Sequence, residues 1–312
     1  MKPTVLAGAL ALLAAFASPA EACLSCSCGG SGVSGDMGAV GGAASFFSMG
    51  SRWLIQEGVS FRSITGSFNE RGDWNPAPTG GSLLTLQGSL GVTYFPTMGA
   101  SVSVQLPAAA NSLDKASWGP LGSINPTDLP RATGYAFGDV LLQGSYKFYE
   151  APSWAVAGFL GGSLPTGQAT GSPESLAGAG VANGLGGLMA ISQLGDLELL
   201  ASVGVQRPFG RPPLAAGTFY IGDAWLYQAQ GNYRLDDRFR VGLGLSGTSG
   251  EGRFGTNELA FSMAKIKLIP SLQYAWAPDR GVRLALGYDP ARFGANSMTD
   301  MTAYAIFYQY AP

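Results

Sequence analysis

Apolar and polar residues alternate along twelve segments of the sequence between residues 51 and 310, and a turn follows each segment. Such alternation predicts β-strands with one apolar and one polar face. In segment 83–95, Leu84 and Leu90 share one face and Thr85 lies on the other. Most segments have nine to thirteen residues, a length that suits tilted strands crossing a bilayer. The predicted strands are 52–63, 83–95, 100–107, 138–149, 154–164, 183–192, 197–207, 224–235, 239–247, 264–276, 282–289 and 301–310.

The connections between these strands are alternately long and short. Short turns fall at 96–99, 150–153, 193–196, 236–238 and 277–281, and the long loops are 64–82, 108–137, 165–182, 208–223, 248–263 and 290–300. A soluble β-sandwich would also show alternating strands, but this order of connections places every long loop on one side of the sheet. Outer-membrane barrels have short periplasmic turns and long external loops. The sequence therefore predicts an all-β fold, a transmembrane antiparallel up-and-down β-barrel of about twelve strands formed by residues 51–312. We refer to its two ends as the short-turn end and the long-loop end.

Aromatic residues gather at the short-turn end, as in the interfacial girdles of membrane proteins. In the last strand, the bulky residues at even positions, from Tyr304 to Tyr310, are expected to face lipid, with alanines on the other side. The expected girdle residues are Trp53, Tyr94, Tyr146, Phe148, Trp154, Tyr233, Phe239, Tyr274, Trp276, Tyr308 and Tyr310.

The first 50 residues differ from the barrel pattern. Lys2, the apolar stretch 5–17 and the small residues at 18–20 predict a signal peptide over residues 1–20, too short to serve as a spanning helix. Residues 21–50 form a Cys/Gly-rich segment, expected to be an N-terminal extension or a plug in the barrel mouth. Export and barrel together predict an integral protein of the outer membrane of a Gram-negative bacterium.

Three cysteines, Cys23, Cys26 and Cys28, are the only ones in the chain, and their spacing is C-x-x-C-x-C. Thiolates at this spacing could hold a soft metal ion. Two of them could instead form a disulfide in the oxidising periplasm, leaving one thiol for a periplasmic partner. Acylation of Cys23 is a third alternative. Apart from this metal, no cofactor is expected.

Charge and composition exclude several functions. Removal of residues 1–20 leaves 17 basic residues (18 less Lys2) against 20 acidic ones, a net charge of −3, which argues against nucleic-acid binding. The sequence has no histidine, so Ser-His hydrolysis and His-ligated zinc or haem are excluded. No paired carboxylates stand out as a catalytic site, and the protein is expected not to be an enzyme.

Charged residues on the predicted inner face are the candidate site residues of the lumen. Seven are basic and three are acidic, although the chain as a whole is acidic. They could attract anionic solutes or polarise a constriction, or they could pair across strands and stabilise the wall. The lumen candidates are Asp139, Lys147, Glu198, Arg234, Arg240, Lys265, Lys267 and Arg283, together with Arg62 and Asp289.

Apolar and aromatic residues complete the candidate set. Those expected to point inward would narrow the lumen and tolerate hydrophobic cargo; they are Leu141, Phe159, Leu188, Leu200 and Leu226. Those in the long loops could capture apolar molecules or pack loop against loop; they are Phe68, Trp74, Trp118, Tyr135, Phe209, Phe219, Tyr220 and Phe293.

Two short motifs carry a resemblance to a known family. Gly138-Asp139 opens a strand that ends Tyr146-Lys147-Phe148, and the next strand runs into Leu164-Pro165-Thr166-Gly167, followed by a Gly-rich stretch. This pattern resembles the outer-membrane putative transporters of the phenol meta-cleavage pathway type, distantly akin to the long-chain fatty-acid channel group. The resemblance implies a barrel that admits small hydrophobic or aromatic molecules.

Two functions follow as hypotheses. The first is a channel for passive passage of a small, hydrophobic or aromatic molecule, with outer-membrane lipid and the cargo as its partners. The second is a barrel scaffold that presents the cysteine segment for metal or redox exchange, or that sleeves a partner protein.

Overall fold

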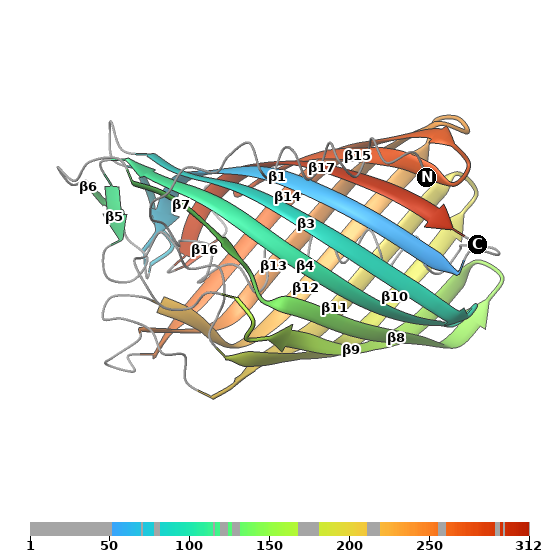
Figure 1. The fold of residues 1–312 in the computed structure, drawn as a ribbon, viewed down its shortest axis with the longest axis horizontal. Helices are drawn as coiled ribbons and strands as arrows, with labels where there is room; N and C mark the ends of the chain where they lie inside the picture. Colours follow the sequence, from blue (N-terminus) through green and yellow to red (C-terminus); the bar gives the residue numbers. More distant parts are fainter. Residues whose placement is uncertain are drawn as a thin grey trace.

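The computed structural model describes residues 52–69, 71–77, 82–114, 116–118, 124–126, 132–167, 181–210, 219–254, 260–290, 294–295 and 297–311. These residues form an antiparallel sheet of tilted strands that closes into a barrel (Figure 1). Within the described residues, no helix is long and apolar enough to cross a membrane. The predicted signal peptide and the Cys/Gly-rich segment lie outside the described residues.

Twelve strands form the wall in the described part of the chain, and each is hydrogen-bonded to two neighbours. They are β1 (Trp53–Phe68), β3 (Ser82–Thr97), β4 (Ala100–Asp114), β8 (Val140–Ala151), β9 (Trp154–Leu164), β10 (Ala182–Leu194), β11 (Leu197–Phe209), β12 (Phe219–Arg234), β13 (Phe239–Phe254), β14 (Ala260–Ala277), β15 (Arg280–Tyr288) and β17 (Ser297–Ala311). Pairing of β1 with β17 and of β13 with β14 completes the ring, which leaves no open edge. The predicted fold class is confirmed.

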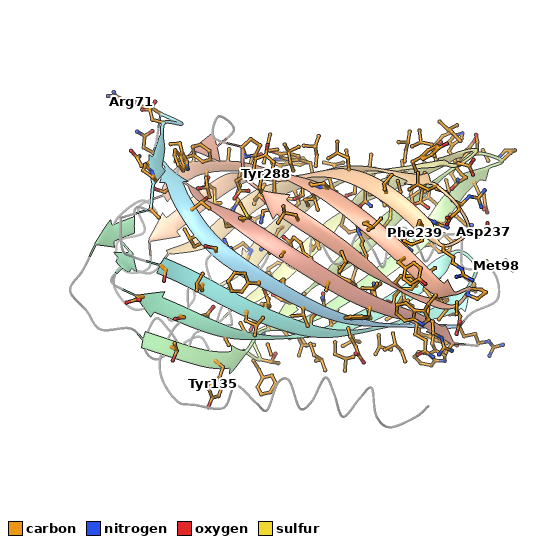
Figure 2. All side chains as sticks on the ribbon, turned by 90° about the horizontal axis from the view of Figure 1, so that it is seen from above. Arg71, Met98, Tyr135, Asp237, Phe239 and Tyr288 are labelled. Carbon is orange, nitrogen blue, oxygen red and sulfur yellow. The ribbon has the colours of Figure 1, made fainter. Side chains whose placement is uncertain are left out.

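Five short strands lie at the long-loop end (Figure 1). They are β2 (Trp74–Pro76), β5 (Ala116–Trp118), β6 (Ile124–Pro126), β7 (Ala132–Phe137) and β16 (Gly294–Ala295). β7 continues the line of β8, because both pair with β4 on the same side. Figure 2 shows Met98, Asp237 and Phe239 at the short-turn end and Arg71 at the opposite end.

Most wall strands extend further toward the long-loop end than the apolar pattern predicts. β1 continues to Phe68 rather than to residue 63, and β13 continues to Phe254 rather than to residue 247. Beyond the hydrocarbon layer, water meets both faces of a strand, so alternation fades while backbone pairing continues. Parts of the predicted loops 64–82, 208–223 and 248–263 are therefore strand.

The inner and outer faces follow the predicted alternation in most strands. In β3, Leu90 is exposed on the outer surface while Thr85 and Thr93 are buried inside. Girdle aromatics pair across neighbouring strands on the outside: the ring centroids of Trp53 and Tyr94 are 4.6 Å apart. Outward apolar side chains remain exposed in the isolated chain because the surface they would pack against is lipid.

The predicted face of the last strand is wrong. Tyr304 and Ile306 are 6% and 3% exposed and point into the barrel, whereas Met301 and Phe307 are exposed on the outside. Tyr308 also points inward, where its hydroxyl accepts a hydrogen bond from Gln273 Nε2 at 2.7 Å. Tyr310 lies on the same face, so neither tyrosine belongs to the outer girdle. The prediction failed because the opposite face, which carries alanines and Phe307, is apolar as well.

Leu188 was expected inside but lies outside. Its side chain is 52% exposed, while its neighbour Met189 is 6% exposed and buried in the lumen. β10 reads Ala-Asn-Gly-Leu-Gly-Gly-Leu-Met-Ala-Ile, so polar residues do not mark either face over most of its length. Without such a marker, the sequence pattern cannot choose between the two faces.

Candidate functional site in the barrel lumen

A charged cluster on the inner wall is centred on Asp300 of β17. Asp300 Oδ2 accepts from Arg62 Nη2 at 2.9 Å and from Lys265 Nζ at 2.7 Å, and Oδ1 accepts from Lys267 Nζ at 2.6 Å. Asp289 Oδ2 accepts from Lys265 Nζ at 2.9 Å and from the Asp300 backbone N–H at 2.6 Å. We call Arg62, Lys265, Lys267, Asp289 and Asp300 the charged cluster.

The strand order explains why these side chains meet. β15 lies between β14 and β17 but ends at Tyr288, well short of the end of either neighbour. Beyond this point, inward side chains of β14 and β17 contact each other directly, and Asp289 follows immediately after the end of β15. Arg62 reaches the cluster from β1, where it pairs with Thr302 of β17. The cluster thus connects β1, β14 and β17 with the residue that follows β15, at the point where the β15 ladder ends.

Sequence reasoning identified four members of the charged cluster and missed Asp300. The predicted last strand began at residue 301, so Asp300 was placed in a loop. The excess of basic residues on the predicted inner face could have indicated a further acidic residue there, because buried cations need an acidic partner.

The two family-like motifs contact each other at the long-loop end of β8 and β9. Gly167 N–H donates to Asp139 Oδ1 at 2.9 Å, and Val140 N–H donates to Thr166 Oγ1 at 2.9 Å. A side chain of each motif therefore accepts a hydrogen bond from a backbone N–H in, or directly after, the other motif. We call this pair of contacts the β8–β9 clamp. Asp139 was a lumen candidate, and in this clamp its side chain holds the ends of β8 and β9 together.

Replacing Asp139 by alanine is expected to lower the free energy of unfolding by about 1–2 kcal/mol, because the Gly167 N–H loses a partly buried charge-assisted acceptor. Thermal unfolding of the refolded barrel in detergent measures the change. Asp139→Asn keeps an oxygen at the same place and serves as the control. Equal stability of wild type and Asp139→Ala would show that the clamp contributes nothing.

Glu198, Arg240 and Lys147 lie on the inner wall nearer the short-turn end. Glu198 Oε1 accepts from Asn232 Nδ2 at 2.9 Å, and Arg240 Nη1 lies 3.9 Å from Glu198 Oε2. Lys147 Nζ lies 2.7 Å from Glu150 Oε2, next to the turn. These three candidates are thus each paired with another side chain.

Arg283 is 8% exposed and donates through Nη2 to Ser271 Oγ at 3.2 Å. With its amide oxygen turned toward the guanidinium, Gln230 accepts from the same Nη2 at 3.0 Å and from Nη1 at 3.2 Å. Neutral hydroxyl and amide groups therefore hold this cation on the wall.

Arg234 lies at the rim rather than in the lumen. It is half exposed and donates to Asp196 in the adjacent turn, with Nη2 2.6 Å from Oδ1. The turn that precedes β15 has a similar pair, in which Arg280 Nη2 donates to Asp279 Oδ2 at 2.8 Å. This hydrogen bond lowers the pKa of the Asp279 carboxyl below its ordinary value. Such exposed pairs at the rim stabilise turns only weakly.

A cavity of about 90 Å³ lies inside the barrel, and none of the described residues that line it is charged. Its walls combine hydroxyl and amide side chains with apolar ones. The lining residues are Gln56, Ser89, Gly91, Thr93, Ser101, Ser103, Val104, Gln105, Leu141, Leu142, Gln143, Ser145, Gly162, Ser163, Asn183, Leu185, Met189, Gln206 and Ile306.

Other predicted inward residues narrow the lumen beside this cavity. Leu200 is buried, and Leu226 shares the inward face of β12 with buried Ala224. The Phe159 ring lies against Gly187 and Gly204, where any Cβ would collide with it. These two glycines make room for an aromatic ring inside the barrel.

The loop aromatics separate into two groups. Phe68 is buried at the end of β1, and Trp74, although 41% exposed, donates through Nε1 to Thr299 Oγ1 at 3.0 Å, so both contact the wall at the long-loop end. Tyr135 and Phe209 are exposed, and Tyr135 lies on the outside of the wall (Figure 2). The side chains of Trp118, Phe219, Tyr220 and Phe293 lie outside the described residues.

The predicted metal ligands Cys23, Cys26 and Cys28 lie outside the described residues. Among the residues that are described, no group of three or more His, Cys, Asp or Glu side chains could hold a metal ion.

The fold is shared with outer-membrane channels of known structure. The COG4313 outer membrane channel from Pseudomonas putida F1 matches with a TM-score of 0.66 and 12% identity, over 83% of this chain and 95% of that one. The NanC porin matches with a TM-score of 0.51 and 10% identity, over 83% of this chain and 100% of that one. The chain therefore has the fold of an outer-membrane β-barrel. A scan against protein-family models found no match, and neither did a search of the curated proteins.

Proposed function

We propose that this protein is an integral outer-membrane channel for the passive passage of a small hydrophobic or aromatic molecule. The observation that carries the proposal is the lumen cavity, whose described lining combines hydroxyl, amide and apolar side chains without a charged one. Such a wall offers hydrogen bonds and apolar contacts to a small aromatic solute. No catalytic role is proposed, since the two similar folds named above are an outer-membrane channel and a porin.

The size of the cavity implies that its wall moves during passage. At about 90 Å³ it is smaller than the roughly 150 Å³ of an engineered apolar cavity that binds benzene. Met189 and Leu185 line the cavity, and unbranched methionine adapts readily to a new shape. Rotamer changes of such side chains would let an aromatic ring pass while the backbone ladder remains intact.

Single-channel recording of the mature protein in planar bilayers tests the proposal. We expect a small ion current that benzyl alcohol interrupts, with a blocking rate proportional to its concentration. A barrel that passes neither ions nor aromatic solutes would contradict the proposal.

A cavity-narrowing variant makes the test specific. A Cβ at Gly91 would meet its neighbours only at ordinary contact distances of 3.7–3.9 Å, so Gly91→Phe places a ring in the cavity without backbone strain. We expect this variant to reduce the ion current at least severalfold. Ala303→Phe adds the same ring on the outer face of β17 and is expected to leave the current unchanged.

The cysteine segment remains a separate proposal. Binding of a soft metal or of a periplasmic partner protein would require Cys23, Cys26 and Cys28 as thiols. Metal analysis of the reduced protein, with all three cysteines changed to serine as the control, tests it. Equal metal content in the two samples would rule out metal binding.

A further inference from the structure

The charged cluster presents cations to the lumen and keeps its carboxylates behind them. The side chains of Arg62 and Lys265 are 16% and 18% exposed, whereas those of Asp289 and Asp300 are 0% and 1% exposed. A solute in the lumen therefore meets the positive side of these ion pairs. The five described side chains carry three positive charges and two negative ones.

Two of these cations are held close together. Arg62 Nη2 and Lys265 Nζ both bind the same oxygen, Asp300 Oδ2, at 2.9 and 2.7 Å. A guanidinium has five N–H donors and an ammonium has three, so each group can bind more than one acceptor. One carboxylate of a solute could therefore bridge the pair from the lumen side.

Asn111 of β4 supplies a second, independent observation. It is 4% exposed, and neither its amide nitrogen nor its amide oxygen has a hydrogen-bond partner. A buried amide without partners is costly unless a ligand satisfies it. Register places Asn111 opposite Thr85, which pairs with Arg62 on its other side. Asn111 and Arg62 thus lie two strands apart in one inward-facing row, roughly 10 Å along the wall.

Along β1, this row lies closer to the long-loop end than the cavity does. Gln56 lines the cavity from the inner face of β1, and Arg62 lies on the same face of β1, six residues closer to the long-loop end. A molecule that enters along β1 from the long loops would therefore pass Arg62 before it reaches Gln56.

We propose that Arg62, Lys265 and Asn111 form an entry site that binds the carboxylate of a singly charged aromatic acid. The cations bind the carboxylate, the Asn111 amide donates a further hydrogen bond, and the ring points toward the apolar side chains of the cavity. This site rests on the proposed channel function and narrows its cargo to aromatic molecules with one carboxylate.

Benzoate and benzyl alcohol are the probes, because they share a phenyl ring and differ in charge. Each is added on the long-loop side of single channels in planar bilayers, and the half-blocking concentration is measured. We expect wild type to be blocked by benzoate at about tenfold lower concentration than by benzyl alcohol, since charge-assisted hydrogen bonds are the stronger ones. Lys265→Met and Arg62→Gln should each raise the benzoate value about tenfold and leave the benzyl alcohol value within twofold.

Two further variants keep the test decisive. Asn111→Ala retains every charge of the cluster and should raise the benzoate value severalfold even where the charge variants fold poorly. Arg207→Gln removes a cation at an exposed position, 70% accessible and paired with Asp223, and should change nothing.

The outcomes separate this site from the channel proposal. Block by benzyl alcohol, with a benzoate value that is the same in wild type and in all three site variants, would overturn the carboxylate site and leave the channel standing. Absence of ion current and of block by either probe would instead overturn the channel itself.

Discussion

Asp300→Ala is expected to lower the free energy of unfolding by about 3–5 kcal/mol, the largest effect of any substitution considered for this barrel. Asp300 is almost fully enclosed and contacts Arg62, Lys265 and Lys267 at 2.6–2.9 Å. Its removal leaves the three cations of the charged cluster with Asp289 as the one remaining carboxylate of that cluster, and Asp289 contacts Lys265. Guanidinium unfolding of the barrel in detergent, followed by tryptophan fluorescence, measures the loss.

Two matched variants test whether charge causes this loss. Asp300→Asn keeps the shape and one acceptor oxygen and should remain strongly destabilised. Adding Lys267→Met to Asp300→Asn removes one unbalanced cation, so the double variant should recover part of the stability, a coupling expected of contacting groups. Asp223→Ala breaks an exposed pair with Arg207 and should cost at most about 0.5 kcal/mol. A loss at Asp300 no larger than at Asp223 would contradict the assigned role of the cluster.

The barrel itself could be predicted because two independent patterns agree. Alternation in a strand such as 83–95 identifies the inner and outer faces of that strand. The order of long and short connections indicates that the strands span a bilayer as a closed barrel. Both depend only on local sequence and on the absence of water from the bilayer core. The twelve predicted wall strands therefore match the observed ones, apart from their ends.

The site could be predicted only in part, because its members meet through strand order and register. Lys265 and Lys267 are recognisable as inward charges from β14 alone. Their contact with Asp300 depends on the early end of β15 at Tyr288, which local alternation does not reveal. The orientation of β17 was also misassigned, since Ala305 and Phe307 make the outer face as apolar as the inner one.

The two motifs show the same limit at shorter range. Gly138-Asp139 and Leu164-Pro165-Thr166-Gly167 suggested a family, but their spacing gave no indication that they touch. The structure shows them as reciprocal partners at the ends of a hairpin, where Asp139 and Thr166 each accept a backbone N–H. Their composition therefore reflects the geometry of a strand end.

Leu160→Arg is expected to lower the free energy of unfolding in phospholipid vesicles by about 2–4 kcal/mol, the cost of a cation facing hydrocarbon near the bilayer midplane. Leu160 lies midway along β9 and is 75% exposed on the outer wall. Gln143→Arg places the same cation on the inner face of the adjacent β8 and should cost less than about 1 kcal/mol. Leu160→Phe keeps the outer face apolar and should be neutral. On a surface that faces water, replacing an exposed leucine by arginine would leave the free energy of unfolding unchanged. A loss of the expected size therefore shows that the outer wall faces lipid, and no loss would show that it faces water.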